Sequence, residues 1–286
     1  MIYAIASGKG GTGKTTITAS LVSLWDTPVM AMDLDVEEPN LHLFLKPDIN
    51  KTNKAYIPVP EVDESKCTLC KACSELCQFK AITVMADTLL TFPEMCHGCG
   101  GCIEICPENA LKETNRELGE ICHGSAKETE FIMGKLRIGE AMSPPLMEQV
   151  KKNLKREARP EDVIIDAPPG VSCPAVSAVI DADCIVLVTE PTPFGLHDFK
   201  LAWEAFSPFG KPMGAVINRA GIGDDSVQLF CRQNGIPIWA EIPYDRTIAE
   251  AYSQGEIVVQ SVKTLRTTFE SLMDKMRAAV SEVSHA

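Results

Sequence analysis

The sequence predicts a doubly wound α/β fold, built on a mainly parallel sheet and interrupted by a small cysteine-rich domain. The first observation is a set of short apolar runs that do not alternate with polar residues, as expected when helices cover both faces of a parallel sheet. The second is a glycine-rich loop between the first apolar run and a helical pattern. The third is a change to closely spaced cysteines in the middle of the chain.

The expected strands and helices follow each other in alternation, which is typical of a doubly wound sheet. Apolar runs predict strands in residues 1–7, 28–35, 162–170, 184–191 and 212–220. Apolar residues at helical spacing predict helices in residues 15–25, 143–157, 198–206, 226–234 and 262–283. Residues 125–140 are compatible with a hairpin.

Composition restricts the partners of the protein. A net charge of −12 repels phosphate backbones and anionic lipids, so we expect neither a nucleic-acid nor a membrane partner. The amino terminus has the pattern of a strand rather than of a signal peptide, and we therefore expect a cytoplasmic protein. In that compartment the 12 cysteines are expected to bind metal rather than to form disulfides.

The cysteine-rich segment contains an internal repeat. Each half has the spacing Cys-x2-Cys-x2-Cys-x3-Cys, which is found in bacterial ferredoxins with two [4Fe-4S] clusters, where the fourth cysteine binds the other cluster. Tetrahedral zinc favours two well-separated pairs instead. The first cluster is therefore assigned to Cys67, Cys70, Cys73 and Cys106, and the second to Cys96, Cys99, Cys102 and Cys77.

This segment predicts the domain organisation. We expect residues 61–112 to form a two-cluster ferredoxin-type domain, inserted into a loop of a larger nucleotide-binding domain that comprises residues 1–60 and 113–286.

Residues 7–16, SGKGGTGKTT, predict a phosphate-binding loop between a strand and a helix. In such loops backbone N–H groups surround a phosphate, Lys14 binds its oxygens and Thr15 binds Mg²⁺. Asp166 ends a later strand and is suited to hold the metal through water. The nucleotide-binding residues expected in the loop are Gly8, Lys9, Gly10, Gly11, Thr12, Gly13, Lys14, Thr15 and Thr16.

Four segments resemble the MinD/ParA/nitrogenase-iron-protein group of ATPases: GKGGTGKTT at 8–16, DLD at 33–35, DAPPG at 166–170 and INR at 217–219. The resemblance implies that the ligands are ATP and ADP and that hydrolysis is slow. It also implies a dimer, in which the second loop lysine, Lys9, reaches the nucleotide of the other subunit and stabilises charge in the transition state.

The same resemblance implies roles for further residues. Asp35 would position the attacking water, and Asp33 would be its neighbour or an ordinary strand-end carboxylate. Asp166 would be the switch II aspartate, and Lys9, Lys14, Asp35 and Asp166 would form the catalytic set. Asn218 would recognise adenine, and Arg219 would either stack on the base or remain solvated.

The combination of such an ATPase with a two-cluster insert resembles the ATPases of the orange-protein complex, which are related to Mrp-type iron–sulfur carriers. It implies dimer closure coupled to electron transfer, with a redox partner. One alternative is ATP-dependent assembly or carriage of iron–sulfur or mixed-metal clusters, with a cluster acceptor. Another is a MinD/ParA-like spatial organiser with structural or sensory clusters. The dimer would contain two copies of this chain or one copy and a paralogous ATPase.

Two cysteines lie outside the repeat in positions that suggest a further site. Cys173 follows Asp166 by seven residues, the offset of a cluster cysteine in the nitrogenase iron protein. Two copies of Cys173 near a dimer axis could hold a bridging cluster or metal, with Cys122 completing the ligands. The alternative for Cys173 is a small residue packed at a helix start.

Overall fold

The computed structural model describes residues 1–155 and 160–284 of the chain. Clustering of contacts divides the protein into two compact units. Unit 1 comprises Met1–Thr52, Ile121–Lys135 and Met147–Ala286, and unit 2 comprises Asn53–Glu120 and Leu136–Leu146. Unit 2 contains the whole of the expected insert and is larger, because parts of the strands that flank the cysteine repeat belong to it.

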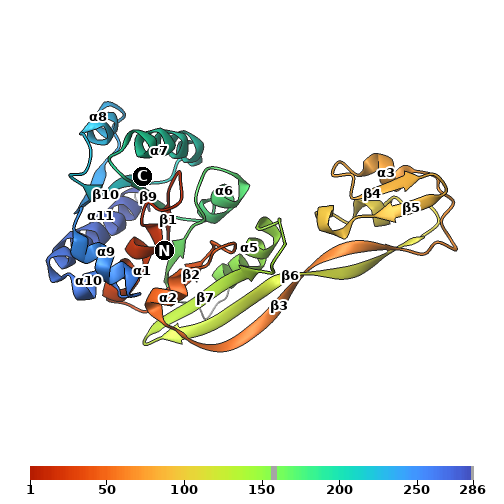
Figure 1. Ribbon diagram of the computed structural model, residues 1–286, viewed down its shortest axis with the longest axis horizontal. Helices are drawn as coiled ribbons and strands as arrows, with labels where there is room; N and C mark the ends of the chain where they lie inside the picture. The colour runs from red at the N-terminus through yellow and green to blue at the C-terminus, as the bar shows by residue number, and fades with distance from the viewer. Residues whose placement is uncertain (156–159, 285–286) are drawn as a thin grey trace. The chain divides into compact units, whose positions relative to one another are not determined.

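The main sheet is mostly parallel, as predicted (Figure 1). Its strands are β1 (Ile2–Ala6), β2 (Val29–Asp33), β3 (Asp48–Val62), β6 (Leu111–Ala126), β7 (Thr129–Leu136), β8 (Asp162–Asp166), β9 (Cys184–Thr189), β10 (Met213–Ala220) and β11 (Ile238–Pro243). Their order is β11-β10-β9-β1-β8-β2-β7-β6-β3. Strand β1 lies between β8 and β9 and is parallel to both.

Helices cover the sheet of unit 1 on both faces (Figure 1). Helix α1 (Lys14–Leu24) packs with α11 (Arg266–Ser284), and α6 (Cys173–Val179) packs with α7 (Pro193–Phe206). The other helices of unit 1 are α2 (Leu41–Leu45), α8 (Ser226–Gln233), α9 (Arg246–Ser253) and α10 (Val258–Ser261), and α5 (Pro144–Lys151) has residues in both units.

The buried core explains the continuous apolar runs of the sequence. Tyr3 and Ile5 of β1 belong to one buried cluster with residues of α1 and α11, including Leu21 and Phe269. Side chains alternate along a strand, so the equally buried Ala4 faces the other side of the sheet. A strand that is buried on both faces needs apolar residues at every position.

Three helices begin or end away from the expected positions. Helix α7 begins at Pro193 instead of 198, because the Thr192 hydroxyl accepts a hydrogen bond from the Gly195 N–H at 3.0 Å and caps the helix. Helix α11 begins at Arg266, after a 3₁₀ turn. The helix expected over 143–157 is α5 followed by a 3₁₀ turn, and residues 156 and 157 lie outside the described residues. Among the elements that the sequence patterns missed are α2, β3, α6, β11, α9 and α10.

A hairpin is present, but most of its first strand precedes the expected range 125–140. Strands β6 and β7 are neighbours in the sheet and are joined by residues 127 and 128 alone, a connection short enough only for antiparallel strands. The turn lies at the start of the expected range because β6 is 16 residues long. In its first half, residues 112–115 are exposed and polar, and so this half lacks the apolar signal of a buried strand.

Unit 2 repeats one short pattern twice. Helix α3 (Ala72–Leu76) contains the third cysteine of the first half and α4 (Gly101–Glu104) the third cysteine of the second, and β4 (Ile82–Met85) pairs with β5 (Thr88–Thr91). The Phe92 N–H donates to Ala81 O and the Asp63 N–H donates to Ala110 O, both at 2.7 Å. The two donors, Asp63 and Phe92, are 29 residues apart, and so are the two acceptors, Ala81 and Ala110. The 29-residue repeat of the sequence is therefore also a repeat of the structure.

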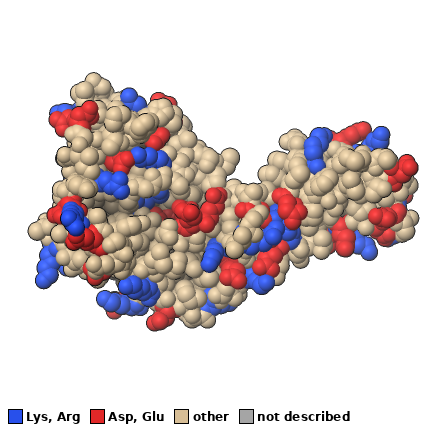
Figure 2. All heavy atoms as spheres, in the orientation of Figure 1, with Lys and Arg blue, Asp and Glu red and all other residues tan. Residues whose placement is uncertain are grey.

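The hydropathy of the helices and the distribution of surface charge bear on the partners that the sequence analysis considered. Within the described ranges, none of the helices combines the length and the apolar character that a membrane crossing requires. On the face shown in Figure 2, lysine and arginine side chains are interspersed with aspartate and glutamate.

We expect Phe269→Ala to lower the free energy of unfolding of unit 1 by about 3–5 kcal/mol, because it removes a ring that is 1% exposed and leaves a cavity between α11 and the sheet. Urea unfolding followed by tryptophan fluorescence measures this, because Trp25, Trp203 and Trp239 all lie in unit 1. The matched control is Phe194→Ala, whose ring is 78% exposed. Equal losses in the two variants would contradict this account of the core.

Candidate functional site

The loop between β1 and α1 has the backbone of a phosphate-binding loop. Gly11 and Gly13 have φ angles of +76° and +96°, which glycine adopts without strain. A Cβ atom at Gly13 would lie 2.3 Å from Nδ2 of Asn218. Helix α1 begins at Lys14, so its free N–H groups and the positive end of its dipole face the loop.

A cavity of about 360 Å³ adjoins this loop. The predicted site residues that line it are Gly10, Gly11, Gly13, Lys14, Thr15, Thr16, Asp35, Asn218 and Arg219. Beyond them the cavity is lined by less polar residues of β11, of the connection after it and of α9–α11, including Tyr244, Ile248, Tyr252 and Phe269. The sequence analysis missed this second half of the cavity because most of its residues come from β11, α9 and α10, which the apolar patterns did not predict.

Lys14 lies among carboxylates at the ends of two neighbouring strands. Asp33 of β2 is in register with Asp166 of β8, and Asp35 follows two residues later. Burial lowers the pKa of Lys14, whereas the charges of Asp166 and Asp35 act in the opposite direction. Burial likewise raises the pKa of Asp166 and that of Asp35 to about 6 each. The charged forms of these two carboxylates are therefore unfavourable in the site, and a bound cation would stabilise them.

The two residues predicted to hold Mg²⁺ are in contact. The Thr15 hydroxyl donates to Asp166 Oδ2 at 2.6 Å, and the Thr18 hydroxyl donates to Oδ1 at 3.2 Å. Hydroxyl and carboxylate oxygens beside a phosphate-binding loop are suitable partners for Mg²⁺, so the residues present fit this ion.

Asp33 has a different environment from Asp35. It accepts the backbone N–H groups of Asp35 at 3.1 Å and of Leu41 at 3.0 Å. Its carboxylate is fully buried, and burial raises its pKa well above the ordinary value. Asp33 therefore holds the chain after β2 in place, whereas Asp35 lines the cavity.

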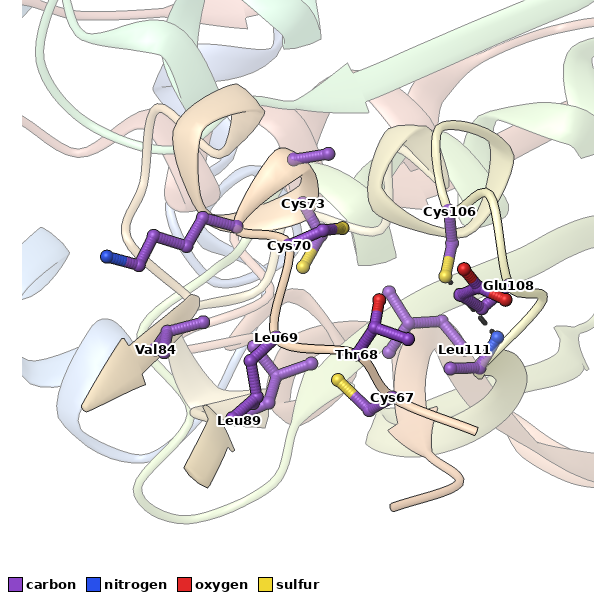
Figure 3. Close-up of a pocket in the computed structure, with 13 residues that line it drawn as sticks. Cys67, Thr68, Leu69, Cys70, Cys73, Val84, Leu89, Cys106, Glu108 and Leu111 are labelled. Carbon is purple, nitrogen blue, oxygen red and sulfur yellow. Dashed lines mark hydrogen bonds between the residues drawn. The ribbon is translucent and has the colours of Figure 1, made fainter. Parts of the chain in front are cut away.

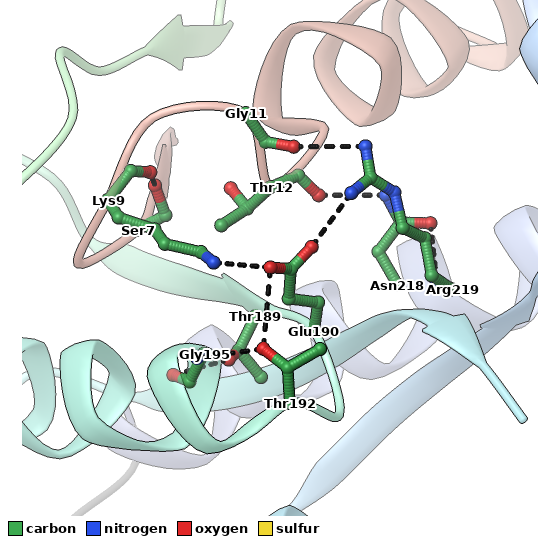
Figure 4. Close-up of polar contacts among 10 residues, drawn as sticks. All are labelled: Ser7, Lys9, Gly11, Thr12, Thr189, Glu190, Thr192, Gly195, Asn218 and Arg219. Carbon is green, nitrogen blue, oxygen red and sulfur yellow. Dashed lines mark hydrogen bonds and ion pairs between the residues drawn. The ribbon is translucent and has the colours of Figure 1, made fainter. Parts of the chain in front are cut away.

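Asn218 and Arg219 bind the phosphate loop in this structure (Figure 4). The Asn218 amide donates to Thr12 O at 2.7 Å, and Arg219 Nη2 donates to Gly11 O at 3.3 Å. Both residues also line the cavity.

Glu190 is a site residue that the sequence analysis missed. Its carboxylate pairs with Lys9 Nζ through Oε1 and with Arg219 Nη1, at 2.9 Å, through Oε2. Lys9 is thus bound within its own chain. A signal was available, because Glu190 directly follows the buried strand β9, whose carboxyl end lies at the same edge of the sheet as the phosphate loop.

The eight cysteines of the repeat surround two cavities in unit 2. The two sets are those expected from the spacing. Cys67, Cys70, Cys73 and Cys106 line the first cavity, and in Figure 3 their sulfur atoms border a common space. Cys77, Cys96, Cys99 and Cys102 line the second. The cavity volumes are about 20 and 380 Å³ respectively.

The loops around the cysteines have matching backbone conformations. Leu69, Lys71 and Lys80 have φ angles of +57°, +67° and +54°. The residues 29 positions later, Gly98, Gly100 and Asn109, have φ angles of +68°, +72° and +49°. Positive φ is unfavourable for leucine and lysine, and such strain is concentrated at functional sites. The first half therefore keeps the shape of the second without the glycines that would favour it.

Backbone N–H groups also approach the sulfur atoms. The Gly98 N–H donates to Cys96 Sγ at 3.4 Å, and the Ala110 N–H donates to Cys106 Sγ at 3.3 Å. Among the described residues, no group of three or more His, Cys, Asp or Glu side chains has the geometry that holds a single metal ion.

Cys122 and Cys173 have different surroundings. Cys122 is 7% exposed and belongs to the apolar cluster beneath α1 and α11, with the Thr52 hydroxyl 3.7 Å from its sulfur. Cys173 is exposed at the first residue of α6. Of the two, Cys173 alone is accessible to a second subunit.

The family model described as the CobQ/CobB/MinD/ParA nucleotide binding domain matches residues 3–259. The chain belongs to this family. It is 32% identical to the uncharacterized protein MJ0579 of Methanocaldococcus jannaschii over 260 residues, which cover 90% of each chain. It is 31% identical to MJ0578 of the same organism over 280 residues, which cover 97% of this chain and 96% of the relative.

Solved structures of MinD proteins share the fold. The septum site-determining protein MinD complexed with Mg-ADP from Pyrococcus horikoshii matches with a TM-score of 0.59 and 22% identity, covering 96% of this chain and 94% of that one. The cell division ATPase MinD of Pyrococcus furiosus matches with a TM-score of 0.58 and 23% identity, covering 97% and 98%. The protein is therefore a MinD/ParA-like nucleotide-binding protein with an α/β fold.

We expect the protein without nucleotide or divalent cations to gain stability as the pH falls from about 7 to about 5. Because the pKa values of Asp166 and Asp35 are about 6 in the fold, against 3.8 ordinarily, the folded chain takes up protons in this range that the unfolded chain does not. Asp166→Asn should stabilise the protein at neutral pH by about 1–3 kcal/mol and make the pH dependence shallower.

Urea unfolding at several pH values measures this dependence. Asp225→Asn, at an exposed position, is the matched control and should retain the slope of the parent protein. An unchanged slope in Asp166→Asn would show that this carboxylate does not take up the proton.

Proposed function

We propose that the protein is an ATP-hydrolysing iron–sulfur protein, in which nucleotide-dependent closure of a dimer is coupled to electron transfer through two [4Fe-4S] clusters. The observation that carries this proposal is the partition of the eight repeat cysteines between two cavities, in a chain that also contains a phosphate-binding loop.

The nucleotide part of the proposal rests on the residues around the cavity of unit 1. The loop N–H groups and Lys14 would bind the phosphates, and Thr15 and Asp166 would hold Mg²⁺ beside them. Asp35 would orient the attacking water, since it lines the same cavity and its pKa of about 6 lets it accept a proton near neutral pH. Asn218 would contact the base after it releases Thr12 O.

The iron–sulfur part rests on unit 2. A cubane takes one thiolate at each of its four iron atoms, so its ligands surround a cavity instead of converging on one point. Such clusters accept and release single electrons. The N–H groups of Gly98 and Ala110 would stabilise the thiolates of Cys96 and Cys106 and so raise the potential of each cluster.

A second candidate function is ATP-dependent assembly or transfer of clusters. It is favoured by the exposure of Cys70 and Cys99, the second cysteine of each half, because an exposed ligand can be replaced by a thiol of an acceptor protein.

We expect protein purified without oxygen to contain about eight iron atoms per chain, and Cys70→Ala to retain about half of them. Iron analysis and electron paramagnetic resonance of the reduced protein measure this. Cys231→Ala, in the core of unit 1, is the matched control and should retain all the iron. Cys173→Ser is expected to do the same, and a loss of iron there would support a bridging site. A colourless parent protein that contains zinc would refute the iron–sulfur proposal.

The response to ATP separates the two functions. Under electron transfer, ATP should shift the midpoint potential or the rate of oxidation of the clusters, while the iron remains bound. Under cluster transfer, ATP should move iron to an added apo-ferredoxin. Lys14→Ala is the control and should remove either response, because it abolishes phosphate binding. Identical results with and without ATP would contradict both functions.

A further inference from the structure

Glu190 lies where the phosphate loop meets the start of α7. It is the first residue after β9, and its side chain is 10% exposed. Register between β1 and β9, with Ala6 opposite Leu187, brings the two strand ends together. Glu190 is thus held by the core of unit 1 rather than by a loose surface loop.

The carboxylate of Glu190 is shared between two cations (Figure 4). Oε1 pairs with Lys9 Nζ and lies 3.4 Å from the Thr192 hydroxyl, and Oε2 pairs with Arg219 Nη1 at 2.9 Å. Arg219 also donates to Gly11 O, and its own φ angle is +57°. A non-glycine residue keeps such a conformation only where its surroundings hold it.

In this arrangement the ammonium group of Lys9 already has an anionic partner in its own chain. The Lys9 side chain is 27% exposed, so its ammonium group lies near the surface but is neutralised by Glu190. Glu190 therefore competes with any phosphate of another subunit for this ammonium group.

We propose that Glu190 is a clasp that keeps Lys9 in its own subunit until nucleotide-bound subunits meet. Exchange of the carboxylate for the partner's phosphates then releases Lys9 towards the dimer interface. This inference rests on the proposed function, because it needs a dimer closed around nucleotide. It adds a regulatory role for a residue that would not touch the reacting atoms.

Glu190→Gln tests the clasp, because glutamine retains the size and the hydrogen bond to Thr192 but removes the charge. In the presence of Mg²⁺ and a non-hydrolysable ATP analogue, we expect the variant to form dimers at about tenfold lower protein concentration than the parent, since a charge-assisted hydrogen bond no longer has to be broken. Analytical ultracentrifugation measures the dimer dissociation constant.

Glu204→Gln is the matched control. It removes the same charge from an exposed position in α7 and should leave dimerisation unchanged. In a Lys9→Ala background, Glu190→Gln should no longer tighten the dimer, because the group that it releases is missing. Equal or weaker dimerisation of Glu190→Gln, while the parent dimerises in a Lys9-dependent way, would overturn the clasp and leave the proposed function intact. A parent protein that does not dimerise with the analogue would refute the dimer and the clasp together.

A second measurement does not depend on the folding of a variant. In the nucleotide-free parent protein, acylation of Lys9 by an amine-reactive ester should be several-fold slower than acylation of the exposed Lys71, because the clasp engages the Lys9 amine. Peptide mass spectrometry measures both rates. Equal rates would overturn the clasp.

Discussion

Parallel pairing of β1 with both β8 and β9 is the constraint on which the nucleotide site depends. Parallel strands end at the same edge of a sheet, so the loop after β1 meets Asp166 at the end of β8 and Glu190 just beyond β9. Thr15 and Asp166 are 151 residues apart in the chain, and Lys9 and Glu190 are 181 apart. Because the strands are buried on both faces, their register and therefore the site are determined by core packing.

The same edge concentrates opposite charges in a partly buried space. Burial raises the pKa values of Asp35 and Asp166, which means that their charged forms are unfavourable there. The hydroxyl of Thr15 and the ammonium of Lys14 compensate in part. A site of this kind is stabilised by a bound cation and phosphate, and so binding energy can be used to change its conformation.

Unit 2 is organised over much shorter distances. Each half of the cysteine repeat forms one loop and one short helix. The first three cysteines of a half line one cavity, and its fourth cysteine, Cys77 or Cys106, lines the cavity of the other half. The hydrogen bond and backbone pattern recurs at the same offset in both halves. Spacing along the chain therefore determines which cysteines share a cavity.

The sequence by itself determined the parallel α/β class, the phosphate loop and the two sets of four cysteines. These features follow from local spacing and from runs of apolar residues, and both can be read along the chain. The boundaries of α7 and the extent of β6 were less predictable, since a cap at Thr192 and an exposed polar strand leave weak apolar signals.

Only the tertiary structure decided that Lys9 pairs with Glu190, that Asp33 binds backbone while Asp35 lines the cavity, and that Cys122 is enclosed in the core. The physical reason is that these contacts depend on strand order and register. A pattern of residues along one segment carries no information about which distant segment will lie beside it.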